Sequence, residues 1–145
     1  MIKPLLLATL LAVTQIGCEK HSTTDVAEVH WDRDMCARCV MVVSDRQNSV
    51  QVRDPKGKVY MFDDIGCMVL WFTKNKTPWQ DKATIWVNDV ETGKWINART
   101  AIYTSGNTTP MAFGFSAHTT KSKLSKENEL LNFEEISKRI LTRKE

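Results

Sequence analysis

Apolar and polar residues alternate along two short stretches near the middle of the chain, and a longer stretch after them has helical spacing. Residues 49–53 and 58–62 alternate as strands do, and residues 54–57 between them, Asp-Pro-Lys-Gly, predict an antiparallel hairpin. Four apolar residues then recur at helical spacing, and they are Ile65, Met68, Val69 and Phe72. This pattern predicts a helix that starts from a cap at Asp63 or Asp64 and runs to about residue 74.

The rest of the chain has a similar plan. Residues 83–87, 95–97 and 101–104 have strand character, and a polar loop then leads to Met111. A second helix follows residues 130–136, with Ile136 and Ile140 on one face. These patterns predict two similar halves, at about 29–79 and 80–145.

A short motif also repeats between the halves. Phe-Asp-Asp-Ile at 62–65 matches Phe-Glu-Glu-Ile at 133–136. Met41 lies 21 residues before the first motif, and Met111 lies 22 residues before the second. If the motif marks a true repeat, the two methionines occupy equivalent places and face each other.

The N-terminus has the pattern of an export signal. A short basic start and an apolar run that is too short to span a bilayer occupy residues 1–17. Cys18 follows Gly17, which predicts a bacterial lipoprotein acylated at Cys18, whereas an ordinary signal peptide would leave this thiol free. Residues 18–28 are predicted to be the lipidated N-terminus and its tether, and residues 29–145 the functional domain. Glu19 favours sorting to the outer membrane.

Charge and cysteine content narrow the range of functions. The net charge is +3, and it falls to +2 without the signal peptide because Lys3 is lost. No basic tract is present, so the sequence does not indicate nucleic-acid binding. If Cys18 carries lipid, the mature chain keeps three thiols, which cannot all pair with one another. A disulfide scaffold is therefore not expected, and the thiols are candidates for function.

Three sulfur-containing residues gather within the six residues from Cys36 to Met41. Thiolates and thioethers suit a soft ion such as Cu(I). On a strand, Cys39 and Met41 would share one face, and Cys36 would add a thiolate from a preceding turn. The repeat makes Met111 a further candidate ligand, although core packing is the common role of a methionine. His118 is a candidate extra ligand, whereas Cys67 is predicted to be a small buried apolar residue.

Two other roles for the cysteine motif remain open. The first is a thiol–disulfide oxidoreductase that uses Cys36 and Cys39, although the expected thioredoxin-like context is absent. The second is a structural zinc site, which requires four ligands at recognisable spacing. No phosphate-binding loop and no metalloprotease motif is present in the sequence.

Four ordered motifs together resemble the NosL family of lipoprotein copper chaperones for nitrous oxide reductase maturation. They are residues 34–41, residues 57–68, Trp95-Ile96-Asn97-Ala98 and Thr109-Pro110-Met111. The resemblance covers most of the mature chain. In two places the chain departs from the family pattern. Val40 replaces a usual glycine, which predicts that the backbone there cannot take a glycine-only conformation. His118 stands where an aromatic residue is common.

The resemblance has several implications. It implies an α+β fold of two ββα-type halves, each a small antiparallel sheet with a helix, organomercurial-lyase-like in part. It implies a periplasmic, lipid-anchored protein that binds Cu(I) and is not an enzyme. It implies that Cys39, Met41 and Met111 form the copper site, with Cys36 assisting. The implied partners are nitrous oxide reductase and the ABC transporter and periplasmic protein of its maturation system.

Overall fold

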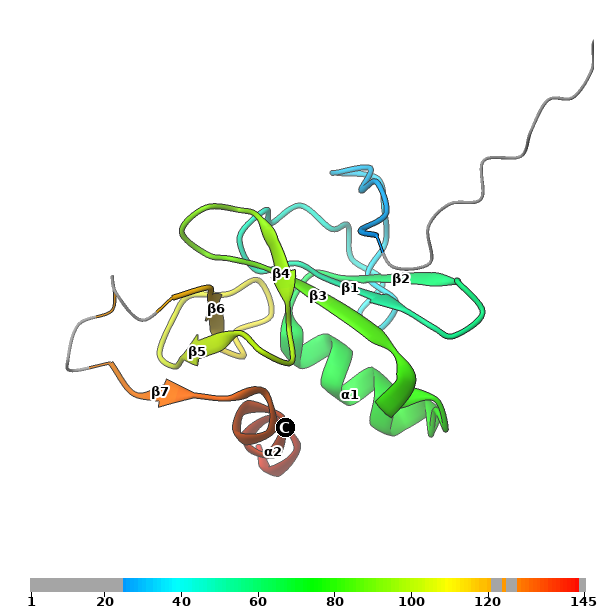
Figure 1. Cartoon of the computed structure of the whole chain (residues 1–145). Helices are drawn as coiled ribbons and strands as arrows, with labels where there is room; N and C mark the ends of the chain where they lie inside the picture. Colours follow the sequence, from blue (N-terminus) through cyan, green and yellow to red (C-terminus); the bar gives the residue numbers. More distant parts are fainter. Residues whose placement is uncertain (1–24, 121–123, 125–127, 144–145) are drawn as a thin grey trace, which may run out of the picture.

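Two small antiparallel sheets and two helices form the fold, with one helix between the second and third strands of the first sheet and the other after the second sheet (Figure 1). The computed structural model describes residues 25–120, 124 and 128–143. The first sheet contains four strands in the order β2-β1-β3-β4, and the second contains three in the order β6-β5-β7. The predicted α+β class, with a helix beside each small sheet, is therefore confirmed. The export signal and Cys18 lie outside the described residues.

The first sheet is built on the predicted hairpin. Its strands are β1 (Val50–Arg53), β2 (Val59–Phe62), β3 (Thr84–Asn88) and β4 (Trp95–Asn97). Val50 and Val52 are fully buried, while Gln51 and Arg53 on the opposite face bind the backbone of residues 25–27. Alternation along β1 therefore assigns one face to the apolar core and the other to the incoming N-terminal segment.

The first helix runs where the apolar spacing predicts it. It is α1 (Ile65–Asn75), and Asp64 caps it by accepting a hydrogen bond from the Gly66 amide at 2.9 Å. The 3-10 helix η1 (Gln80–Lys82) then leads to β3. Among the described residues neither α-helix is long and apolar enough to cross a bilayer. The core-facing residues of α1 are Ile65, Cys67, Met68, Val69 and Phe72.

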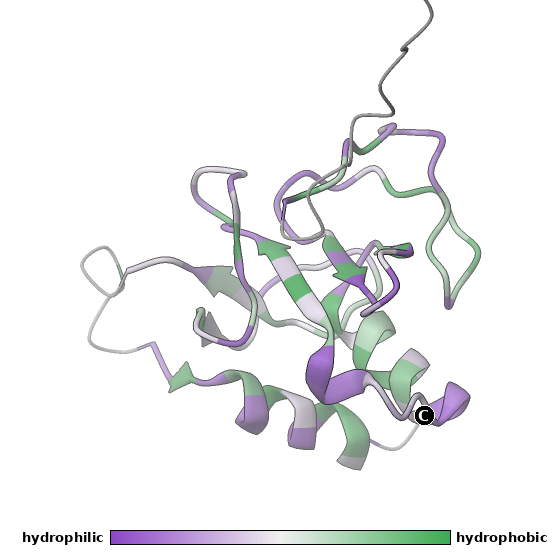
Figure 2. Ribbon diagram, turned by 45° about the vertical axis from the view of Figure 1, so that its right-hand side comes forward, coloured by the Kyte–Doolittle hydropathy of each residue, from purple (hydrophilic) through white to green (hydrophobic). Residues whose placement is uncertain are grey.

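The second sheet is smaller. It contains β5 (Ile102–Thr104), β6 (Ser116–His118) and β7 (Leu130–Leu131), and α2 (Phe133–Thr142) follows it. Figure 2 colours one side of α2 hydrophilic, and only Ile136 and Ile140 of this helix are buried. The two helices pack against each other, which joins the two sheet–helix units into one core.

Two details of the predicted halves differ in the structure. Strands β3 and β4 lie after the predicted division at residue 79, yet they complete the first sheet because β3 pairs with β1. The repeated motif is also out of register. Phe62 ends a strand and Asp64 is a cap, whereas Phe133 already lies within α2 and Asn132 is its cap. Met41 and Met111 are therefore not at equivalent positions of a repeat.

Candidate metal centre

Three cysteines from two separated parts of the chain meet at the junction of β2 and α1. The sulfur atoms of Cys36, Cys39 and Cys67 all lie within 4.8 Å of one another. Cys36 and Cys67 are buried, and Cys39 is partly exposed. All three are free thiols. The cluster is thus open to solvent mainly on the side of Cys39.

A tight loop holds Cys36 and Cys39 in place. The Cys36 amide donates to the Met41 carbonyl at 2.8 Å, and the Val40 amide donates to the Cys36 carbonyl at 3.0 Å. The Ala37 amide donates to Met61 at the end of β2, also at 2.8 Å. These bonds fasten the loop to the edge strand of the first sheet and so bring its thiols to the start of α1.

The prediction that Cys39 and Met41 share the face of a strand is wrong. The chain turns at these residues, so Met41 is 53% exposed while Cys39 faces the cluster. The turn requires Val40 to adopt φ of +60°. The backbone therefore takes the left-handed conformation that glycine favours, contrary to the expectation from the sequence, even though Val40 is β-branched.

Replacing Val40 with glycine is expected to raise the free energy of unfolding by about 0.5–1 kcal/mol. The left-handed conformation costs a β-branched residue about 1–2 kcal/mol, and part of that gain is offset by the larger backbone entropy of an unfolded glycine. Val40 is 69% exposed, so little packing is lost. Urea unfolding of the reduced protein measures this, with Val42→Gly, which should destabilise, as the control. A destabilised Val40→Gly protein would contradict the strain at this residue.

Cys67 comes to the cluster from the first turn of α1. Its amide donates to the Asp64 carbonyl at 3.0 Å, and its Sγ lies 4.0 Å from Nη1 of Arg38. The prediction that Cys67 is a buried small residue is confirmed by its full burial. The sequence reasoning did not place it beside Cys36 and Cys39. The sequence signal that could have placed it there is its position in the first turn of a predicted helix that directly follows a predicted strand.

Hydrogen bonding makes the three thiols unequal. The Cys67 thiol, and also the Cys39 and Asp63 backbones and the Cys39 thiol, hydrogen-bond to the Cys36 sulfur, and they lower the pKa of Cys36 to about 4 despite its burial. Donation to this thiolate, together with burial, raises the pKa of Cys67. Burial, and donation to Cys36, raise the pKa of Cys39. In the metal-free cluster these shifts favour a thiolate at Cys36 beside the protonated thiols of Cys39 and Cys67.

We expect the thiolate absorbance of the metal-free protein to persist down to about pH 4 and to vanish in Cys36→Ser. An unfolded cysteine keeps its proton up to about pH 8.5. Since the folded pKa of Cys36 is depressed to about 4, its contribution to stability is full above the unfolded pKa and is lost as pH falls through the folded pKa. Ultraviolet titration under argon measures the thiolate. A single titration near pH 8.5 would contradict the arrangement.

The loop that carries Met111 is anchored to the start of the same helix. The Asp64 carboxylate accepts a hydrogen bond from Thr109 Oγ1 at 2.6 Å and one from the Met111 amide at 3.2 Å. Burial raises the pKa of the Asp64 carboxyl, although these hydrogen bonds act in the opposite direction and lower it. Asp64 thus joins the Met111 loop to the helix turn that bears Cys67. The Met111 side chain is partly buried and packs against the core.

Phe113 extends this loop over the start of α1. A Cβ atom on Gly66 would lie 2.0 Å from the Phe113 ring, so the ring occupies the space that a larger residue would fill. The guanidinium carbons of Arg38 and Arg143 lie 5.9 and 5.6 Å from its centroid. An aromatic ring and a cation therefore lie beside the cysteine cluster.

His118 is not brought to the cysteines. It lies in β6 with 7% exposure, where its Nε2 is 3.0 Å from Thr104 Oγ1 and its Nδ1 is 3.5 Å from Glu91. These contacts belong to the second sheet and the β3–β4 turn. Of the candidate ligands, the structure thus groups Cys36 and Cys39 with Cys67, holds Met111 through Asp64, and leaves Met41 at the surface and His118 elsewhere.

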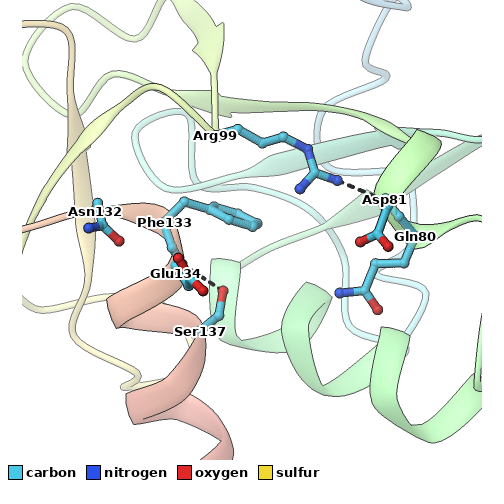
Figure 3. A pocket seen from close by; sticks show the side chains of 7 residues that line it. All are labelled: Gln80, Asp81, Arg99, Asn132, Phe133, Glu134 and Ser137. Atoms are coloured by element: carbon cyan, nitrogen blue, oxygen red, sulfur yellow. Dashed lines mark hydrogen bonds between the residues drawn. The ribbon is translucent and has the colours of Figure 1, made fainter.

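A separate cavity of about 560 Å³ lies between η1 and α2 (Figure 3). Arg99 crosses it, donating to the Gln80 carbonyl at 2.8 Å and lying 5.5 Å from the centroid of the Phe133 ring. None of its lining residues is a cysteine, a methionine or a histidine. This cavity therefore offers no soft-metal ligand, unlike the cluster of Cys36, Cys39 and Cys67.

Comparison with known proteins identifies the fold and the family. The fold is similar to that of the copper chaperone NosL from Shewanella denitrificans, solved by crystallography, with a TM-score of 0.63 and 16% identity over 76% of this chain and 94% of that one. A search of curated protein sequences found no significant match. The sequence profile of the NosL family matches residues 28–140. The chain therefore belongs to the NosL family.

Proposed function

We propose that this protein is a copper chaperone that carries Cu(I) on the thiolates of Cys36, Cys39 and Cys67. The observation that carries the proposal is the three sulfur atoms within 4.8 Å of one another. Soft thiolates favour Cu(I), which is stable with three sulfur ligands. A structural zinc site takes four ligands, and no histidine, aspartate or glutamate joins the cluster among the described residues.

Exposure suggests the direction of transfer. Cys36 and Cys67 are buried, Cys39 is partly exposed and Met41 is 53% exposed. A thioether binds Cu(I) more weakly than a thiolate does, so Met41 provides an exchangeable ligand at the outer side of the site. Met111, held by Asp64, provides a second one. Copper would leave past these methionines by ligand exchange with a partner.

The cellular setting is part of the same proposal. Cys18 would carry lipid and hold the domain at a membrane facing the periplasm. Glu19, the residue after Cys18, favours the outer membrane. The client would be nitrous oxide reductase, reached with the ABC transporter and periplasmic protein of its maturation system. Membership of the NosL family and the similarity to a solved copper chaperone support the copper part of this proposal. The lipid anchor rests on the sequence pattern that ends at Cys18. The chain acts as a carrier and not as an enzyme.

An anaerobic Cu(I) titration against a chromogenic chelator tests the function. The reduced protein is expected to bind one equivalent, and Cys39→Ser to bind far more weakly. Met41→Leu and Met111→Leu should bind less tightly by smaller factors, since each removes a neutral ligand. Failure of the wild-type protein to compete for copper would remove the chaperone function. Tight binding that is indifferent to both methionine changes would confine the site to the three cysteines.

The titrated proteins also test the second candidate function. That function is thiol–disulfide exchange, which a lowered pKa of Cys36 beside two further thiols would favour. A protein that reduces insulin disulfides but does not compete for Cu(I) would favour the oxidoreductase. Copper binding without insulin reduction would favour the chaperone.

A further inference from the structure

One end of the fold gathers lysines around a partly exposed tryptophan. We define the lysine end as the β1–β2 turn, the C-terminus of α1 and η1. Its exposed lysines are Lys56, Lys58, Lys74, Lys76 and Lys82. A cavity of about 420 Å³ lies between the turn and η1, lined by Asp54, Pro55, Lys56, Pro78, Trp79 and Lys82. The turn and the α1–β3 connection therefore form one continuous surface.

Trp79 and its neighbours give this surface an aromatic centre. The Trp79 ring is partly exposed and lies 5.9 Å from the Tyr60 ring and 5.8 Å from the Phe72 ring, measured between centroids. The Lys58 Nζ lies 4.9 Å from the centroid of Tyr60. Tryptophan and tyrosine flanked by lysines are enriched where proteins meet the lipid–water boundary.

The chain enters the domain beside this surface. Nη2 of Arg53 donates to the Asp25 carbonyl at 2.8 Å, while Nη1 of the same guanidinium donates to the Gly57 carbonyl of the β1–β2 turn at 3.1 Å. Cys18 precedes Asp25 by seven residues. A chain of that length reaches at most about 25 Å. A lipid on Cys18 would therefore keep Asp25, and the lysine end beside it, within that distance of the bilayer.

Acidic groups at this end are fewer than the lysines. Asp54 and Asp81 belong to the lysine end, and Asp25 lies beside it. The Asp54 carboxylate accepts hydrogen bonds from the Lys56 and Lys58 amides at 2.8 and 2.9 Å. The net positive charge complements an anionic bilayer surface, which attracts clustered lysines near an anchor.

We propose that the lysine end rests on the anionic phospholipid surface of the membrane that holds the lipid anchor. The proposal depends on acylation of Cys18 and is independent of copper binding. β2 runs from the lysine end to the cysteine cluster, and α1 returns from the cluster to the lysine end. Since the 11-residue α1 is about 16 Å long, the contact directs the thiols away from the bilayer.

The test uses the acylated protein as cells produce it, incorporated into vesicles that contain brominated phosphatidylcholine. Bromine on the acyl chains quenches tryptophan that touches the bilayer, and Trp79→Phe removes the contribution of Trp79 while keeping its ring contacts. The charge variant is Lys56→Glu with Lys82→Glu. Its matched control is Lys94→Glu with Lys138→Glu, two exposed lysines outside the lysine end.

We expect quenching of the wild-type protein in vesicles with phosphatidylglycerol and little in pure phosphatidylcholine. Trp79→Phe and the Lys56/Lys82 variant should lose the quenching, and the Lys94/Lys138 variant should keep it. High salt should reduce it. Equal quenching in all four proteins, equal quenching in both lipids, or loss in the control pair would overturn the proposal. A chain without an acyl group on Cys18 would overturn it too, whatever its copper affinity.

Discussion

Replacing Cys67 with alanine is expected to lower the affinity of this protein for Cu(I) by more than about a hundredfold. Loss of a residue that only hydrogen-bonds to a metal ligand lowers metal affinity about 10–100-fold. Cys67 is proposed as a direct ligand, so its loss should cost more. Its sulfur lies within 4.8 Å of those of Cys36 and Cys39. The change leaves two thiolates and a small cavity at the start of α1. Anaerobic competition with a Cu(I) chelator measures the affinity.

Met68→Leu is the matched control for Cys67→Ala. Met68 follows Cys67 on α1 and is also fully buried, and leucine conserves its volume within the core. This variant should bind copper as the wild-type protein does. If Cys67→Ala binds as tightly as Met68→Leu, then Cys67 is a packing residue only and the copper site lies on the loop of Cys36 and Cys39.

Replacing Asp64 with alanine is expected to lower the free energy of unfolding by about 3 kcal/mol. The change removes the cap of α1, worth about 1 kcal/mol, and leaves Thr109 and the Met111 amide without their charged acceptor. Asp64 is fully buried, so water cannot replace the carboxylate without rearrangement. Urea unfolding of the reduced, metal-free protein measures this.

Two further variants separate the roles of Asp64. Asp64→Asn keeps one oxygen for the Gly66 amide but places an NH₂ donor against other donors, so it should lose an intermediate amount of stability. Asp81→Ala removes an exposed aspartate and should stay within about 0.5 kcal/mol of the wild type. An Asp64→Ala protein as stable as Asp81→Ala would show that the Met111 loop does not depend on this carboxylate.

Local patterns were sufficient to predict most of the fold. The hairpin of β1 and β2, the helix after it and its cap at Asp64 follow from alternation, turn residues and helical spacing over a few residues each. The pairing of β3 with β1 is not local, so the division between the halves was misplaced. The prediction of a repeat was wrong because the two motifs do not occupy the same position relative to a helix. Phe-Asp-Asp-Ile ends where α1 begins, whereas Phe-Glu-Glu-Ile lies wholly within α2.

The candidate site was only partly predictable. Cys36 and Cys39 share one loop, so their spacing alone marks them. Cys67 lies 28 residues beyond Cys39, and its apolar neighbours made core packing the simpler prediction. What brings it to the cluster is the bond between Ala37 and Met61, a tertiary contact with no sequence signature. The left-handed turn at Val40 was missed because a β-branched residue disfavours it.

The closeness of the three thiols also sets a limit on the working life of the unloaded carrier. Any two sulfur atoms less than 4.8 Å apart need only small side-chain rotations to reach disulfide bonding distance. In an oxidising compartment, an empty chain would thus lose two of its three ligands to a disulfide, while a bound ion would shield them. Copper binding and the lifetime of the free thiols are therefore coupled. A bound copper ion would protect its own ligands from oxidation, and only the copper-loaded protein would keep all three thiols.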